Sequence, residues 1–334
     1  MAVEPEREGQ EDFLIRAVFA EGRLWVLSDA GIISSIAEGG DHWTREPALG
    51  AAMDLCVQSG RLLVAVGESD GANEWKLEEH ESGAWKDRAV IERRNDALLA
   101  IDCSVDHVTL LTSRRLIDLK SGSDYQRMVA LKSKLGRGIV GAVLGTPQEL
   151  YVGFNAGEWG GGLQRIDRRD GTIETIERNT SGELCGGPLN VSCDPVTGIA
   201  AIPWKSGCIA VSIGLVHFLP HGGIVEVCGD KVKVLYSKPF IEEGTFCGQA
   251  KPDDPICTVA FFGLARAGES LWAAGIDGIY ELRNGGSERV VPLPDFKKID
   301  GIYVSFDLPN ITLVLTSVNR RRSVSGAVPI LVPH

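Results

Sequence analysis

The stretch Glu149–Ile166, ELYVGFNAGEWGGGLQRI, contains the pattern that decides the fold. Apolar side chains alternate at Leu150, Val152 and Phe154, the chain then breaks at a glycine-rich loop, and a second apolar run follows. Alternation with a period of two is typical of a strand with one buried face, and two such runs around a turn-forming loop predict a β-hairpin. The stretch is therefore predicted to be strand, loop, strand.

Looser copies of this hairpin recur along the chain. They lie at Arg23–Ile33, Arg61–Val66, Val108–Leu119, Leu150–Ile166, Gly198–Pro203, Ser270–Tyr280 and Ile311–Thr316. Three to four short antiparallel strands that repeat every 40 to 50 residues or so are the pattern of a β-propeller. We predict an all-β fold, a β-propeller of seven blades with three to four antiparallel strands each. Six blades is the alternative, because the fifth copy is irregularly spaced.

The predicted propeller occupies residues 13–334 as one domain. Residues 1–12 are predicted to be an acidic tail, and residues 239–258 a loop insertion. The tail lacks the apolar core of a signal peptide, and no run approaches the roughly 18 apolar residues of a membrane helix. Ring closure is expected to pair a strand from one terminus, Phe13–Ala20, with the other terminal unit, and to bring Val328–Val332 close to it.

The net charge of −11 limits the classes of partner that can be expected. An acidic surface repels nucleic acid and anionic membranes, so neither is expected as the main partner. The basic run Arg320–Arg322 is more typical of a solvated loop than of a binding patch. We expect a monomer; a basic protein partner is electrostatically reasonable, and so is the absence of any partner.

The chain contains eight cysteines, and six of them lie between residues 185 and 257. No two have the C-x2-C spacing of a zinc ribbon. One interpretation is reduced core thiols, especially Cys56, Cys103 and Cys228. The other is disulfides that tie loops in an oxidising compartment, with Cys185–Cys193 and Cys247–Cys257 as the candidate pairs. Localisation therefore stays open: the N-terminus as written favours the cytoplasm, and bridged cysteines would favour the periplasm or secretion.

The irregular sequence is expected to gather on one face of the ring. In a propeller, the connections between second and third strands and between consecutive blades emerge on the same face, which ligands and partners use. The loop Asn155–Gly162 is predicted to lie there, where its glycines would allow close backbone approach; alternatively, Trp159 only packs over the next blade. The predicted partner-binding residues are Asn155, Glu158, Trp159, Trp204 and Lys205.

Catalytic motifs are not evident. The sequence contains no G-x-S-x-G, H-E-x-x-H or phosphate-binding loop, so no catalytic residue is predicted. On one strand, His217 and His221 would lie about 13 Å apart, so core or loop roles are expected for them. Carboxylates from different blades are weak candidates for a metal site in the channel, each more typical of a solvated or turn-capping role. They are Asp54, Asp102, Asp300 and Glu158.

The recurrent pattern Leu24-Trp25-Val26, followed by Gly31-Ile32, resembles the degenerate bacterial propellers of sensor and lactonase-like proteins. The resemblance is to an architecture, without a specific family. The favoured function is a non-catalytic propeller that docks a protein through the loop-rich face of blades 4 and 5, as a scaffold, a sensor or a toxin-neutralising immunity protein. It requires no cofactor. The alternative implied by the resemblance is a lactonase-like hydrolase that holds calcium in the central channel.

Overall fold

The computed structural model describes residues 14–46, 50–67, 73–104, 107–120, 125–179, 185–249, 257–286, 288–293, 302–308, 310–316 and 330–334. The acidic tail predicted for residues 1–12, the candidate Asp300 and the run Arg320–Arg322 lie outside these ranges. The part of the chain that is described contains no helix long and apolar enough to cross a membrane.

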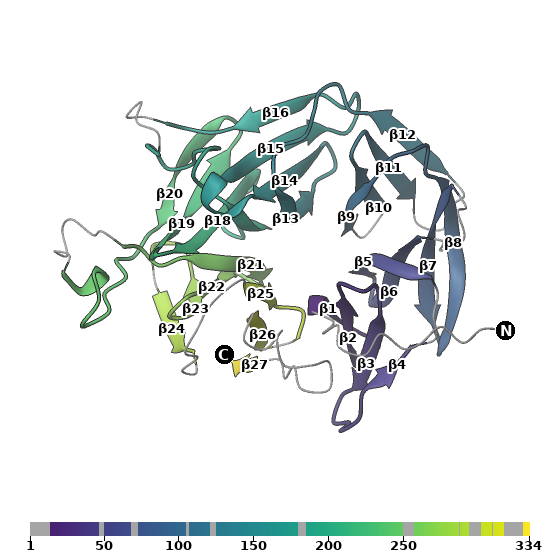
Figure 1. Ribbon diagram of the computed structural model, residues 1–334, viewed down its shortest axis with the longest axis horizontal. Helices are drawn as coiled ribbons and strands as arrows, with labels where there is room; N and C mark the ends of the chain where they lie inside the picture. Colours follow the sequence, from purple (N-terminus) through teal and green to yellow (C-terminus); the bar gives the residue numbers. More distant parts are fainter. Residues whose placement is uncertain are drawn as a thin grey trace.

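Seven antiparallel sheets surround a central axis (Figure 1). The fold is a seven-bladed β-propeller, as the repeat pattern predicts. Blade 1 comprises β1 (Leu14–Ala20), β2 (Arg23–Ser28), β3 (Ile33–Ala37) and β4 (Thr44–Arg45). Blade 2 comprises β5 (Ala51–Gln58), β6 (Arg61–Gly67), β7 (Glu74–Glu81) and β8 (Ala84–Glu92). Blade 3 comprises β9 (Leu98–Cys103), β10 (His107–Thr112), β11 (Arg115–Lys120) and β12 (Gln126–Ala130).

The remaining blades follow the same order from the axis outward. Blade 4 comprises β13 (Ile139–Gly145), β14 (Glu149–Asn155), β15 (Gly161–Asp167) and β16 (Ile173–Ile176). Blade 5 comprises β17 (Val196–Ala201), β18 (Cys208–His217), β19 (Leu219–Cys228) and β20 (Lys231–Tyr236). Blade 6 comprises β21 (Phe261–Ala267), β22 (Ser270–Gly275), β23 (Gly278–Leu282) and β24 (Glu288–Pro292). Blade 7 comprises β25 (Ile302–Ser305), β26 (Ile311–Thr316) and β27 (Ile330–Pro333).

The hydrophobic core is divided among the spaces between neighbouring blades. Trp25 of blade 1 packs with Val64 of blade 2, and Trp75 of blade 2 packs in a cluster with Leu110 of blade 3. A four-stranded sheet is too small to be stable alone, so each blade becomes stable by burying both faces. The alternation seen in Glu149–Ile166 is the sequence signature of this requirement.

The ring closes by side-chain packing rather than by the predicted strand pairing. β1 pairs with β2, and β27 pairs with β26, so no described sheet mixes strands from the two termini. Leu14, Ala17 and Val26 of blade 1 instead pack against Leu313 of blade 7. The interface between the first and last blades is thus of the same kind as the others.

Blade 5 differs from its prediction by one strand. The apolar run Gly198–Pro203 was expected to be the second strand, but it belongs to the innermost strand, β17. The second strand is β18, which forms the longest hairpin of the propeller with β19, ten residues on each side. Both strands are apolar along most of their length, so alternation alone does not separate inner from second strand.

All eight cysteines are paired. The pairs are Cys56–Cys103, Cys185–Cys193, Cys208–Cys228 and Cys247–Cys257. The loop pairs considered from the sequence are therefore present, whereas the interpretation of Cys56, Cys103 and Cys228 as reduced thiols is wrong. Cys56 and Cys103 lie on the innermost strands of blades 2 and 3, which only the folded ring brings together.

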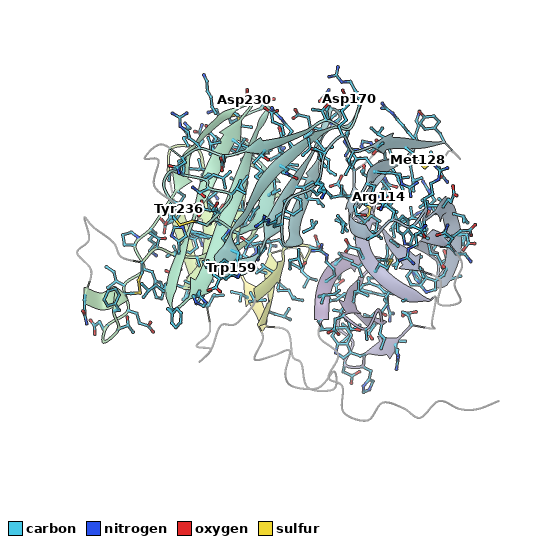
Figure 2. All side chains as sticks on the ribbon, turned by 45° about the horizontal axis from the view of Figure 1, so that its top comes forward. Arg114, Met128, Trp159, Asp170, Asp230 and Tyr236 are labelled. Atoms are coloured by element: carbon cyan, nitrogen blue, oxygen red, sulfur yellow. A yellow bond between two sulfur atoms is a disulfide. The ribbon has the colours of Figure 1, made fainter. Side chains whose placement is uncertain are left out.

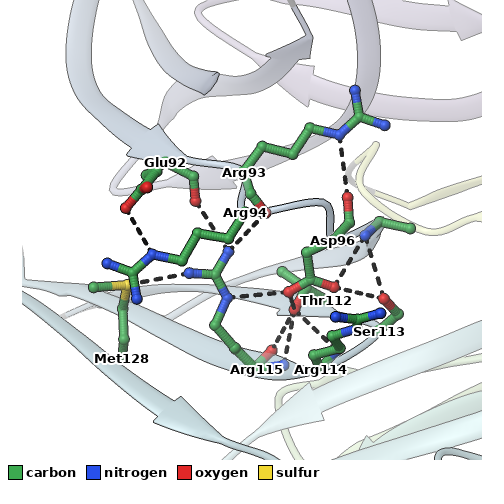
Figure 3. A network of polar contacts seen from close by, with 10 residues as sticks. Glu92, Arg93, Arg94, Asp96, Thr112, Ser113, Arg114, Arg115 and Met128 are labelled. Carbon is green, nitrogen blue, oxygen red and sulfur yellow. Dashed lines mark hydrogen bonds and ion pairs between the residues drawn. The ribbon is translucent and has the colours of Figure 1, made fainter. Parts of the chain in front are cut away.

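A buried carboxylate organises the connection between blades 2 and 3 (Figure 3). Asp96 accepts hydrogen bonds from the hydroxyl groups of Thr112 and Ser113 and from Nε of Arg115, the last at 3.0 Å. Arg115 also donates to the carbonyl oxygen of Glu92 at 3.0 Å. Burial acts to raise the pKa of Asp96, but its hydroxyl and guanidinium donors outweigh burial and hold the pKa below the usual value.

The substitution Asp96→Asn should lower the free energy of unfolding by about 3 kcal/mol at pH 7, because it leaves the Arg115 guanidinium buried without its counter-charge. A depressed pKa stabilises the folded state above the unfolded-state pKa, and this contribution is lost as the pH falls through the folded-state pKa. The difference in the free energy of unfolding between Asp96→Asn and wild type should therefore shrink only below about pH 4. Urea unfolding at pH 7 and pH 3 measures it, and an equal difference at both would contradict the ionised pair.

The four disulfides predict the result of labelling the cysteines with maleimide. Protein that is unfolded in guanidinium without reductant should bind no maleimide, because every sulfur is in a bridge, and protein that is first reduced should bind eight equivalents. Mass spectrometry counts the labels. Labelling of Cys56 or Cys103 without reductant would show that the bridge between blades 2 and 3 is absent.

Candidate functional site

The loop between β14 and β15 is held in place by the connection to the next blade. The side-chain oxygen of Asn155 accepts a hydrogen bond from the backbone N–H of Gly157 at 2.9 Å and starts η1 (Gly157–Trp159). Gly160 has φ +78°, and a Cβ there would lie 2.3 Å from the carbonyl oxygen of Val191. Gly160 therefore allows the close approach of this protein's own chain, and the approach of a ligand to this loop stays a prediction.

The β18–β19 hairpin lies against this loop. The His217 Nε2 is 2.8 Å from the Glu158 Oε2, which joins the end of β18 to η1. Phe218 forms the apex of the hairpin, where its ring is 92% exposed, and Trp159 is 76% exposed. The imidazole of His217 contacts the ring of Phe218 with centroids 4.3 Å apart. We call Glu158, Trp159, Val216, His217 and Phe218 the hairpin surface.

The apex of the hairpin is conformationally strained. Phe218 has φ +60°, a left-handed conformation that bulky residues rarely adopt. Strain of this kind costs about 1–3 kcal/mol and tends to occur at functional positions. The hairpin pairs His217 directly with Leu219, so the strained residue is the whole turn, and Phe218 is largely exposed despite the contact of its ring with His217.

The second histidine of the hairpin is also paired with a carboxylate. Nε2 of His221 is 3.1 Å from Oδ1 of Asp194, whose other oxygen accepts the backbone N–H of Asn190 at 2.6 Å. His217 and His221 therefore contact different carboxylates of the blade 4–5 region rather than each other. The four-residue spacing of the two histidines does not predict these contacts, because Glu158 and Asp194 are distant from them in the sequence.

The predicted insertion extends the same region outward. The carbonyl oxygen of Pro220 accepts the N–H of Thr258 at 3.1 Å, so the insertion returns to the ring beside the hairpin. Figure 1 shows its described part reaching beyond β19 and β24. Ile241 and Phe246 are exposed there, next to exposed Glu242 and Glu243. Exposed apolar groups and carboxylates thus occur together.

Two predicted partner-binding residues lie elsewhere. Trp204 and Lys205 belong to the turn between β17 and β18, separated from His217 by the whole length of β18, about 30 Å. Trp204 packs against the core between blades 5 and 6. In Figure 2, Trp159 and Asp230, which lies in the β19–β20 turn, are at opposite ends of the blades. The expected grouping is wrong because Gly198–Pro203 is an inner strand.

The central channel is a cavity of about 700 Å³ lined by the innermost strands. Asp54 lies on the channel wall, and both oxygens of its carboxylate accept hydrogen bonds from the protein. Oδ1 is 2.9 Å from Nε of Arg16 of blade 1, and Oδ2 accepts the N–H of Ile101 of blade 3 at 3.0 Å. This side chain holds three blades together.

Asp102 serves the contact between blades 3 and 4. Its Oδ1 accepts the N–H of Gly145 at 3.1 Å, and its Oδ2 is 3.7 Å from Nη2 of Arg168. Arg168 is 4% exposed and donates through Nη1 to Asp118 at 2.6 Å. Burial raises the pKa of Asp102, and the Gly145 amide and the Arg168 charge oppose this only in part.

The candidates Asp54 and Asp102 do not by themselves fit calcium. Calcium requires six to eight oxygen ligands, whereas the carboxylate of Asp54 and one oxygen of Asp102 already accept hydrogen bonds. No group of three or more histidine, cysteine, aspartate or glutamate side chains within the described ranges is placed to hold a metal ion. The third candidate, Asp300, lies outside these ranges. We derive no catalytic step through a metal.

Comparison with known proteins gives the fold. No protein-family model matches the chain, and a comparison with curated protein sequences gives no match. Among solved structures, YCF48 bound to the D1 peptide has a TM-score of 0.56 at 13% identity, covering 92% of this chain and 90% of that one. The β-propeller domain of the Trilobed protease from Pyrococcus furiosus, described as having an open velcro topology, has a TM-score of 0.53 at 8% identity, covering 96% and 95%.

A third similar structure is the extracellular domain of the putative one component system BT4673 from B. thetaiotaomicron. It has a TM-score of 0.52 at 12% identity, over 92% of this chain. The present chain spans only 38% of the length of that domain. At these identities the likeness establishes a β-propeller and no function.

The strain at Phe218 predicts an unusual response to mutation. Phe218→Gly should leave the free energy of unfolding unchanged or raise it by up to about 1 kcal/mol, because glycine adopts φ +60° without steric cost. Urea unfolding measures this. As a control, truncation of the buried ring in Phe261→Ala should cost about 3–5 kcal/mol. A similar loss for Phe218→Gly would show that its ring is packed.

Proposed function

We propose that the protein is a non-catalytic binding propeller that docks a basic protein partner on the hairpin surface. The observation that carries the proposal is the exposure of two large aromatic rings, Trp159 and Phe218, on elements that Glu158 and His217 tie together. A strained turn that exposes an aromatic ring to solvent lowers stability without a structural gain. Binding of a partner to the exposed ring would explain why the strained turn is present.

Aromatic anchors surrounded by polar groups are typical of protein interfaces. Tryptophan and tyrosine dominate hot spots, and phenylalanine is enriched in interface cores. Here Glu158 directly precedes Trp159, and we call it, together with the exposed Glu242 and Glu243 of the insertion, the acidic rim. A basic partner fits this rim and the net charge of −11, which would steer its approach.

The disulfides support a proposal for localisation. Four bridges persist in an oxidising compartment and are rare in the cytosol, so we place the protein in the periplasm or outside the cell. A sensor domain, a scaffold and a toxin-neutralising protein all fit this placement. The identity of the partner separates these three roles.

Paired variants test the docking surface. Wild type, Trp159→Ala combined with Phe218→Gly, and the control Trp43→Ala are immobilised and exposed to extracts of native cells. Trp43 is a partly exposed tryptophan on blade 1, remote from the hairpin surface. Quantitative mass spectrometry should recover a partner with wild type and with Trp43→Ala, and lose it with the double variant.

The recovered partner then gives an affinity by calorimetry. Each substitution on the hairpin surface should weaken binding by about 2 kcal/mol, roughly 30-fold, because each removes one aromatic anchor. Higher salt should slow association with an acidic rim. Equal affinities for the double variant and wild type, with unchanged unfolding curves, would refute this docking surface.

A further inference from the structure

A groove with the opposite charge lies at the other end of blade 5. Its volume is about 870 Å³, and it runs between the connection that leads from blade 4 and the outer strand β20. We call it the basic groove; the residues that define it are Arg178, Pro188, Lys205, Glu226, Lys231 and Lys233. It is separated from the hairpin surface by the length of β18.

The floor of the basic groove holds a buried carboxylate between two lysines. Glu226 is 4% exposed, and its Oε1 is 2.7 Å from Nζ of Lys205 and 3.2 Å from Nζ of Lys233. Burial acts to raise the pKa of Glu226, but the two ammonium groups outweigh burial and hold the pKa below its usual value. The carboxylate therefore stays charged and fixes both lysines at the groove.

Two further cations are among the described residues that line the groove. The side chains of Arg178 and Lys231 are exposed and form no ion pair with another described residue. Asp230, next to Lys231 in the sequence, does not line the groove; it is 2.8 Å from Nη2 of Arg165, a guanidinium that also contacts Glu149 and Glu174. Among the described residues that line the groove, four cations and one carboxylate give a net charge of +3, in a protein whose net charge is −11.

The walls of the groove are covalently fixed and partly apolar. Cys208 and Cys228 face each other across β18 and β19 and contribute their disulfide to the lining. The backbone of Arg178 donates to the carbonyl oxygen of Leu189 at 2.8 Å, within a connection closed by Cys185–Cys193. Pro188 and the exposed side chain of Val234 add apolar surface.

We propose that the basic groove binds a small organic anion, a carboxylate or phosphate ester with an apolar body. A ligand pocket of this size is typically apolar with a few charged groups that orient the ligand. Guanidinium and ammonium groups at the edge match the oxygens of a carboxylate or a phosphate, and Arg178 offers the planar donor pair for a two-point contact. The apolar lining matches the body of the ligand, which inorganic anions lack.

Calorimetry with four probes tests the proposal. Isophthalate and phenyl phosphate carry an anionic group on an aromatic body, dimethyl isophthalate is neutral, and inorganic phosphate has no apolar body. At least one of the first two should bind with a dissociation constant below about 1 mM, and at least tenfold more tightly than the last two. Binding of isophthalate alone assigns the groove to carboxylates, and binding of phenyl phosphate alone assigns it to phosphate esters.

Matched variants locate the binding. Arg178→Gln combined with Lys231→Gln should weaken binding of the tighter probe about tenfold or more, because it removes two of the four cations of the groove. Lys134→Gln, an exposed lysine of the blade 3–4 connection, should leave it unchanged. Unchanged melting temperatures show that the variants fold. Failure of both anions to bind, or binding that the double variant does not weaken, would overturn the proposal.

The basic groove and the hairpin surface are tested separately. The Arg178→Gln, Lys231→Gln variant should retain full affinity for the protein partner, because β18 separates the two regions by about 30 Å. A loss of partner binding in this variant would assign the groove to the partner interface, and would overturn its assignment to a small anion.

Discussion

The carboxylate of Asp54 is the contact that fixes three of the seven blades relative to one another. It joins the Arg16 side chain of blade 1 to the Ile101 backbone of blade 3, across blade 2 to which it belongs. Blades are stable only as neighbours, so a side chain that sets the position of three of them determines the geometry of the channel. The disulfide between Cys56 and Cys103 joins the innermost strands of blades 2 and 3, and the buried Arg168 of blade 4 contacts Asp102 and Asp118 of blade 3.

The fold could be predicted because it repeats. Short apolar runs recur seven times along the chain, and a sheet that buries both faces between neighbours requires that recurrence. The sequence pattern misplaces blade 5 by one strand because β17 and β18 are both apolar along most of their length, so periodicity does not show which of them lies at the axis. Closure was also wrong, because packing of Leu14 against Leu313 leaves no trace in local sequence.

The candidate site was predicted only in part. The loop around Trp159 was identified from its composition, and Glu158 does lie at the hairpin surface. Phe218 was missed, because a phenylalanine in an apolar run is usually a core residue, and only the one-residue turn exposes it. Trp204 and Lys205 were grouped with Trp159 through the blade 5 error. The basic groove was not predicted, since its charges come from segments that are distant in the sequence.

The central claim is that a partner docks at the hairpin end of blades 4 and 5. The most direct measurement is site-specific photo-crosslinking in native cells, with benzoylphenylalanine placed either at Phe218 or at Asp170. Asp170 lies in the β15–β16 turn, and Figure 2 shows it at the opposite end of the blades from Trp159. The account predicts a discrete crosslinked species from position 218 and none from position 170. A crosslink from position 170 alone, or from neither position, would contradict it.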